Sequence, residues 1–179
     1  MLRDGVLLAV TDGVAVTGPR PPGRDDRARA VATALPRHGV VGRDSAAWVH
    51  SGRRPPSRTC VLVPVGIRRP DPRPDRWCAE TTFGDDDVVL LDGVPVTSLV
   101  RTAVDVARWY DGTTGAGLLA DLVGAGLDLA AVRRRLVALA GRPHVRRALD
   151  TVDAAVRRSE SGPPTTAGLS AARRPDGPP

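Results

Sequence analysis

The chain has 179 residues, with 26 basic and 20 acidic side chains and a formal net charge of +6. This length allows one compact domain or two small ones that fold without disulfides, and two cysteines, Cys60 and Cys78, do not form a disulfide framework. No apolar stretch approaches the roughly 20 residues of a membrane span, and residues 1–10 lack the pattern of a signal peptide. We therefore expect a cytoplasmic protein with reduced thiols and no membrane partner.

The basic charge is unevenly distributed. All 26 basic residues are Arg, and Lys, Asn and Gln are absent, as expected for a coding sequence rich in G and C. Residues 1–84 carry a charge of +6, residues 85–127 carry −5 and residues 128–179 carry +5. A pI near 10.9 permits an acidic partner such as nucleic acid. The two basic segments predict either two basic surfaces or ordinary solvated faces.

The first predicted element is a β-hairpin in residues 2–16. Val6, Leu8 and Val10 alternate with other residues, and Thr11-Asp12-Gly13 is a turn signal. Such a ribbon is typical of the wing of a winged helix, although a wing normally follows its helices.

Hydrophobic periodicity and turn residues predict the elements of the middle of the chain. We expect helices at residues 24–35 and from Asp44 or Ser45 to Gly52, strands at 39–41, 58–65, 77–83, 88–91 and 94–96, an exposed loop at 68–76 and a turn at 85–87.

The most regular stretch is residues 92–108. Asp92-Gly93 predicts a tight hairpin turn, and Ser98, or Thr97, predicts the cap of a helix. In that helix Leu99, Ala103 and Val106 share an inward face, whereas Arg101, Asp105 and Arg108 share a charged face. An Arg101–Asp105 pair contributes only a few tenths of a kcal/mol if it is exposed.

Three helices are predicted next, at residues 114–123, 128–139 and 143–156, followed by a Pro- and Gly-rich end. The predicted fold class is α+β. It comprises a partial winged-helix-type hairpin and linker (1–22), a small mixed α/β middle that ends in a helical bundle (23–158), and a disordered tail (159–179).

No residue pattern indicates catalysis, and we expect no metal, no cofactor and no enzyme activity. The residues that bind zinc are scattered as His38, His50, His144, Cys60 and Cys78, without metal-ligand spacing. A P-loop and a G-x-S-x-G motif are both missing from the sequence. Asp85-Asp86-Asp87 indicates a solvated turn better than a cation site, because three consecutive residues cannot converge on one ion.

The arginines of the last two helices are the candidate binding residues. Six of them surround the predicted junction of these helices: Arg133, Arg134, Arg135, Arg142, Arg146 and Arg147. They predict salt-sensitive contacts with nucleic-acid phosphates. The alternative is a solvated polar face in an Arg-biased sequence.

The order of motifs resembles the actinobacterial AbiEi-like antitoxin and transcriptional-regulator family of type IV toxin-antitoxin systems. The family pattern S-H-x-S-A-A-x-x-H-G is similar to a part of residues 40–52, with Ser45 and His50. The more specific pattern D-G-[IVL]-x-V-T-S-x-x-R-T-x-x-D-L-A-R is similar to residues 92–108. It carries Asp92, Gly93, Thr97, Ser98, Arg101, Thr102 and Asp105. The likeness spans residues 5–161.

This resemblance implies a non-catalytic protein that binds a nucleotidyltransferase-like toxin and operator DNA. The chain departs from the family pattern at both ends, where it lacks the helix-turn-helix before the wing and the later motifs of relatives fused to a very-short-patch-repair-like endonuclease. We therefore expect a chain truncated at both ends. The alternatives are an inactive relative of such a nuclease fusion and a pure protein-interaction module.

Overall fold

The computed structural model describes residues 7–11, 14–17 and 21–160. Its strands are β1 (Leu7–Thr11), β2 (Val14–Thr17), β3 (Val40–Val41), β4 (Thr59–Pro64), β5 (Arg76–Thr81), β6 (Val88–Leu91) and β7 (Val94–Thr97). Its helices are α1 (Arg24–Ala32), α2 (Arg43–Ser51), α3 (Leu99–Trp109), α4 (Gly112–Gly124), α5 (Leu129–Ala138) and α6 (Val145–Glu160). The predicted α+β class is confirmed.

Five strands form one mixed sheet in the order β5-β4-β3-β7-β6. The outer pairs differ, since β4 and β5 run parallel whereas β6 and β7 run antiparallel. In the centre, β3 pairs antiparallel with β4 and parallel with β7. β5 and β6 are therefore the edges of this sheet.

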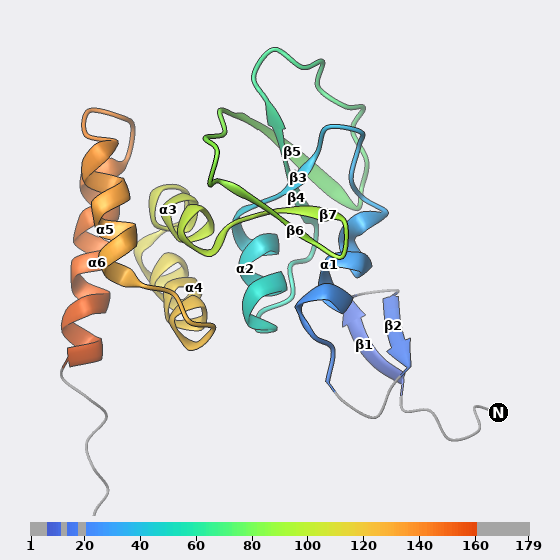
Figure 1. The fold of residues 1–179 in the computed structure, drawn as a ribbon, viewed down its shortest axis with the longest axis horizontal. Coiled ribbons are helices and arrows are strands. Elements are labelled where there is room, and N and C mark those ends of the chain that lie inside the picture. Colours follow the sequence, from blue (N-terminus) through green and yellow to red (C-terminus); the bar gives the residue numbers. More distant parts are fainter. Residues whose placement is uncertain (1–6, 12–13, 18–20, 161–179) are drawn as a thin grey trace, which may run out of the picture.

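The hairpin of β1 and β2 is a separate two-stranded sheet that contacts α1 (Figure 1). The predicted hairpin is confirmed, whereas its turn at residues 12–13 lies outside the described residues.

Helix α2 lies between α1 on one side and α3 and α4 on the other (Figure 1). Its Ala46, Trp48 and Val49 belong to an apolar cluster with α1, β3 and β7. Its Ala47 belongs to a second cluster, which is built mainly by α3, α4, α5 and α6. One short helix thus contributes to both cores, because nearly every face of it is buried.

Local signals set most helix ends close to where the sequence predicts them. Ser98 caps α3 and Asp128 caps α5 through their side chains. α2 begins at Arg43, one residue early, and Gly52 ends it in the left-handed conformation with φ of 72°. α4 begins at Gly112, two residues before the predicted start, because Asp111 accepts hydrogen bonds from the first turn.

The last helix reaches further than expected. α6 continues through Glu160, two residues into the segment predicted as a tail, and residues 161–179 lie outside the described part of the chain.

Candidate anion-binding site

The junction between β7 and α3 is held by hydroxyl groups of the family-like motif. Thr102 Oγ1 donates to the carbonyl oxygen of Thr97 at 3.1 Å. Thr97 Oγ1 lies 2.7 Å from Thr102 Oγ1 and is therefore the donor to it. Ser98 Oγ accepts a hydrogen bond from the backbone N–H of Arg101 at 3.4 Å. These three side chains fix the direction in which α3 leaves the sheet.

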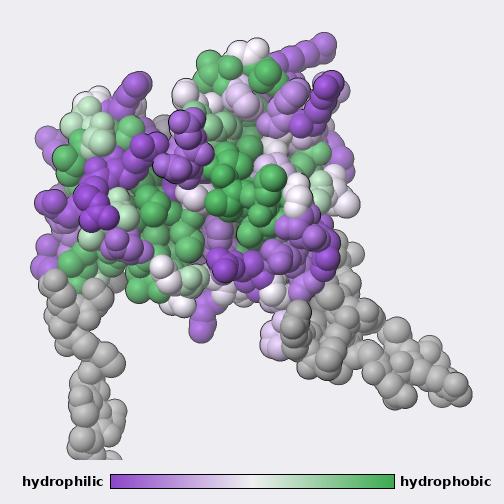
Figure 2. All heavy atoms as spheres, viewed as in Figure 1, coloured by the Kyte–Doolittle hydropathy of each residue, from purple (hydrophilic) through white to green (hydrophobic). Residues whose placement is uncertain are grey.

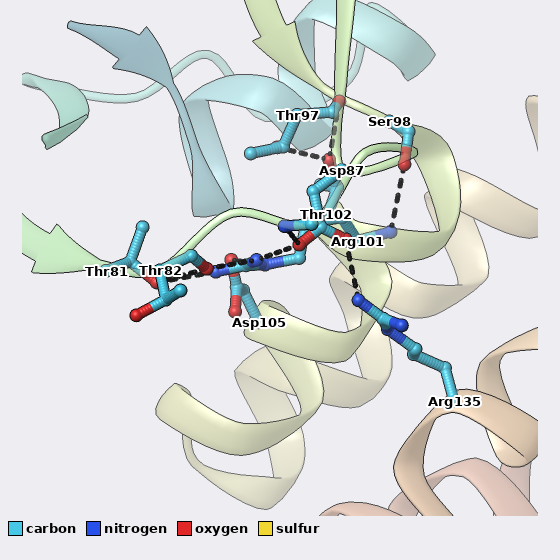
Figure 3. Close-up of polar contacts among 10 residues, drawn as sticks. Thr81, Thr82, Asp87, Thr97, Ser98, Arg101, Thr102, Asp105 and Arg135 are labelled. Atoms are coloured by element: carbon cyan, nitrogen blue, oxygen red, sulfur yellow. Dashed lines mark hydrogen bonds and ion pairs between the residues drawn. The ribbon is translucent and has the colours of Figure 1, made fainter. Parts of the chain in front are cut away.

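Arg101 is the centre of a buried polar network (Figure 3). Its Nε donates to Asp105 Oδ2 at 2.9 Å, and its Nη1 donates to Asp87 Oδ2 at 2.5 Å. Its two terminal nitrogens also donate to Thr81 Oγ1 at 2.6 Å and to the carbonyl oxygen of Thr82 at 3.0 Å. The guanidinium therefore ties α3 to the chain between β5 and β6.

The charged face of α3 is buried at Arg101 and Asp105. The side chains of Arg101 and Asp105 are only 10% and 4% exposed. The predicted pair does form, but the carboxylate of Asp87 and residues 81–82 cover it. The few tenths of a kcal/mol that apply to an exposed helix pair do not apply here.

Burial and charge act against each other in this network. Burial lowers the pKa of Arg101, but Asp105 and Asp87 together raise it above its ordinary value. Burial raises the pKa of Asp105, in spite of the opposing charge of Arg101. The guanidinium of Arg101 thus stays charged and compensates the buried carboxylate of Asp105.

Two more residues of the family-like patterns, Ser45 and His50, connect α2 to the sheet. Ser45 Oγ accepts a hydrogen bond from the backbone N–H of Cys60 at 2.8 Å, which joins α2 to β4. His50 Nε2 lies 2.8 Å from the carbonyl oxygen of Thr97 and donates to it, because a carbonyl oxygen only accepts. Burial lowers the pKa of His50, and its Nδ1 has no hydrogen-bond partner among the described residues.

Asp92 and Gly93 form the tight turn between β6 and β7, as predicted. Both have positive φ, of 49° and 78°, which is the conformation that a two-residue hairpin of this kind requires. The carboxylate of Asp92 also accepts a hydrogen bond from Arg29 of α1 at 2.8 Å.

The six predicted arginines do not share one position. Arg133 and Arg134 lie on the exposed side of α5, where they pair with Asp153 and Asp128. Arg146 and Arg147 are exposed at the start of α6, and Arg147 donates to the carbonyl oxygen of Arg108 at 2.8 Å.

Arg135 and Arg142 line a cleft together with residues from α3. The cleft has a volume of about 410 Å³ and is bounded by the segment after β5, by α3 and by the connection from α5 to α6. The residues that line it are Thr81, Thr82, Phe83, Gly84, Asp87, Arg101, Val104, Arg108, Arg135, Leu139, Arg142 and Pro143. We call it the arginine cleft. Arg135 Nη2 donates to Asp87 Oδ1 at 3.2 Å across it (Figure 3).

The arginine cleft has the side chains of an anion-binding site. Guanidinium groups offer planar sets of N–H donors that match carboxylate and phosphate oxygens. Sequence reasoning missed Arg108 and Phe83 as lining residues. The only available signal was the seven-residue spacing of Arg101 and Arg108, which places both on one side of a helix but does not show what faces it.

Arg43 connects the sheet to the helices by aromatic contacts. The guanidinium carbon of Arg43 lies 4.9 Å from the ring centroid of Trp77 and 5.1 Å from that of Trp109. Arg43 also has a positive φ of 52° at the first residue of α2. These two cation–π contacts join β5, α2 and α3.

Other kinds of site find little support in the described residues. No group of three or more His, Cys, Asp or Glu side chains there could hold a metal ion. Cys60 and Cys78 are both free thiols, and burial raises the pKa of Cys60 well above its ordinary value. None of the helices described is long and apolar enough to cross a membrane.

Comparisons of the sequence with protein-family models and with curated proteins found no match.

Proposed function

We propose that this chain is a non-catalytic binding protein of the AbiEi-like antitoxin and transcriptional-regulator type, which binds a nucleotidyltransferase-like toxin and operator DNA. One observation carries the proposal. The polar groups of the family-like motif, including Ser45, Thr102, Arg101 and Asp105, are used in hydrogen bonds within the fold. The motif residues therefore stabilise the fold, and in this proposal the exposed side chains make the contacts with other molecules.

In this proposal the toxin contacts the edge strand β6. Leu90 and Val89 of β6 are 71% and 37% exposed, and β6 ends the five-stranded sheet. Figure 2 shows hydrophobic residues on the surface in this part of the molecule. An edge strand with exposed apolar side chains is a common site of protein contact, because it offers both unpaired backbone groups and apolar area.

In the same proposal the exposed arginines bind DNA. Arg133, Arg134, Arg146 and Arg147 lie on the surface of α5 and α6, where they supply phosphate contacts without reading sequence. The hairpin of β1 and β2 takes the place of the wing.

The test is co-purification with any nucleotidyltransferase-like protein that is encoded beside this chain, together with a gel shift on the upstream DNA of the chain's own gene. We expect the partner to be retained and the shift to weaken as salt rises. Leu90→Asp should abolish retention of the partner without unfolding the chain. Val65→Asp is the matched control, because Val65 is 64% exposed and follows β4 instead of lying on β6.

The outcomes separate the alternatives. Retention of the partner without a shift favours a pure protein-interaction module. No retained partner and no salt-sensitive shift would contradict the proposal and favour an inactive relative of the nuclease-fused proteins.

A further inference from the structure

The arginine cleft holds more positive charge than its own acids neutralise. Four arginines line it, and Asp87 is the one acidic residue among the lining side chains. Asp87 pairs with Arg101 and Arg135, and Asp105 pairs with Arg101 from behind the cleft. These two acids balance two of the arginines. The remaining charge is that of Arg108 and Arg142.

Arg108 is held in place without a carboxylate partner among the described residues. Its Nε and Nη2 both donate to the carbonyl oxygen of Pro143, at 3.2 and 3.1 Å. Burial lowers the pKa of Arg108, and although Asp105 opposes this effect, the charges of Arg101, Arg142 and Arg43 add to it. An anion beside Arg108 would relieve this repulsion among like charges.

Arg142 completes the pair from the opposite element. It lies in the connection from α5 to α6, lines the cleft and is exposed. Like Arg108, it forms no ion pair within the part of the chain that the structure describes. A fixed guanidinium and an exposed one at the same cavity suit a phosphate group, because phosphate oxygens accept from two guanidinium groups at once.

The rest of the lining suits a planar ring. Phe83, the one phenylalanine of the chain, is half-exposed at the cleft, and the guanidinium of Arg101 lies 5.4 Å from its ring centroid. Val104 and Leu139 add apolar area, and Thr82 adds a hydroxyl group. Aromatic rings and arginine planes are the groups on which nucleic-acid bases stack. A volume of about 410 Å³ lies within the usual range of small-molecule sites.

We propose that the arginine cleft binds a nucleoside phosphate, with the phosphate between Arg108 and Arg142 and the base against Phe83. This ligand is either a free nucleotide or the phosphorylated end of a nucleic-acid strand. The inference goes beyond the proposed function and does not depend on it, since neither the edge strand β6 nor the exposed side of α5 lines the cleft.

The first experiment is isothermal titration calorimetry of the full chain at low salt. The probes are adenosine 5′-diphosphate, adenosine and inorganic phosphate. We expect the diphosphate to bind at least tenfold more tightly than either fragment, and its affinity to fall as salt rises. A diphosphate that binds no more tightly than inorganic phosphate would overturn the proposal, because the base would then make no contact.

Variants locate the binding site. Arg142→Ala should weaken binding of the diphosphate at least tenfold, since it removes a charged donor, and Phe83→Leu should weaken it several-fold while keeping apolar volume. Arg37→Ala is the matched control, because it removes the same charge from an exposed position outside the cleft. Circular dichroism checks that each variant is folded. Equal losses in Arg142→Ala and Arg37→Ala would indicate general surface attraction and contradict the site.

Competition identifies the source of the ligand. A single-stranded hexanucleotide with a 5′-phosphate, and the same strand with a 5′-hydroxyl, are titrated against bound diphosphate. Displacement by the phosphorylated strand alone indicates a strand end, whereas displacement by neither indicates a free nucleotide. Displacement by both strands equally would contradict the proposal, because backbone phosphates would then suffice.

Discussion

Arg101 shows how strongly burial changes the contribution of an ion pair to the free energy of unfolding. Arg101→Ala leaves Asp87 and Asp105 buried with less compensation, since their side chains are 6% and 4% exposed. We expect the free energy of unfolding to fall by about 3–5 kcal/mol, measured by urea denaturation. Arg133→Ala is the control, because its pair with Asp153 is exposed, and it should cost less than about 1 kcal/mol. Equal losses would mean that Arg101 contributes no more than a surface charge.

His50 makes stability depend on pH near neutrality. Burial holds its folded pKa below the ordinary 6.5, so the unfolded chain takes up a proton at a pH where folded His50 is still neutral. The stabilising contribution of neutral His50 is therefore present above about pH 6.5 and is lost as the pH falls through the folded pKa. Between pH 7.5 and 5.5 we therefore expect the free energy of unfolding to drop.

The comparison variant for this prediction is His50→Gln. Its amide can still donate to the carbonyl oxygen of Thr97 but does not titrate, so most of the drop between pH 7.5 and 5.5 should disappear. His38→Gln changes an exposed histidine and should keep the drop. Urea denaturation at both pH values measures it, and an unchanged pH dependence in His50→Gln would argue against this role.

At the scale of single elements, local chemistry in the sequence predicts what depends on a few adjacent residues. The Asp92-Gly93 turn and the caps of α3 and α5 follow from side-chain and backbone preferences that act within four residues. The sequence predicts that α4 begins at Thr114, two residues after its observed start, because Gly112 and Gly115 lower the helix propensity of the first turn. The two hydrogen bonds that Asp111 accepts from the backbone N–H groups of the first turn outweigh that penalty.

The candidate site is only partly predictable from the sequence, because it depends on contacts between distant segments. The family-like motif marks the residues that join β7 to α3, but their spacing does not reveal that residues 81–82 and Asp87 cover Arg101. Arg135 and Arg142 were among the predicted binding residues, whereas Phe83 is brought to the cleft only by the tertiary fold. Contacts between distant segments decide the site, and periodicity within one segment carries no information about them.

At the scale of the molecule, α2 should make the sheet and the helices α3–α6 unfold together. Both apolar clusters include α2, so neither half keeps its core if the other is lost. Val152 of α6 is fully buried in the helical half. Val152→Ala should cost about 2 kcal/mol through lost burial and the cavity that remains.

If the sheet and the helices α3–α6 unfold together, Val152→Ala lowers the stability of the sheet as well as that of the helices. We expect amide hydrogen exchange to accelerate about 30-fold in β4 as well as in α3, because both sets of amides exchange through one global opening. Val137→Ala removes the same two methyl groups from a side chain that is 51% exposed, and it should leave both sets unchanged. Acceleration confined to α3–α6 would show that the helices open by themselves. In that case α2 stays with the sheet, and the arginine cleft, which both halves line, opens without unfolding of the chain.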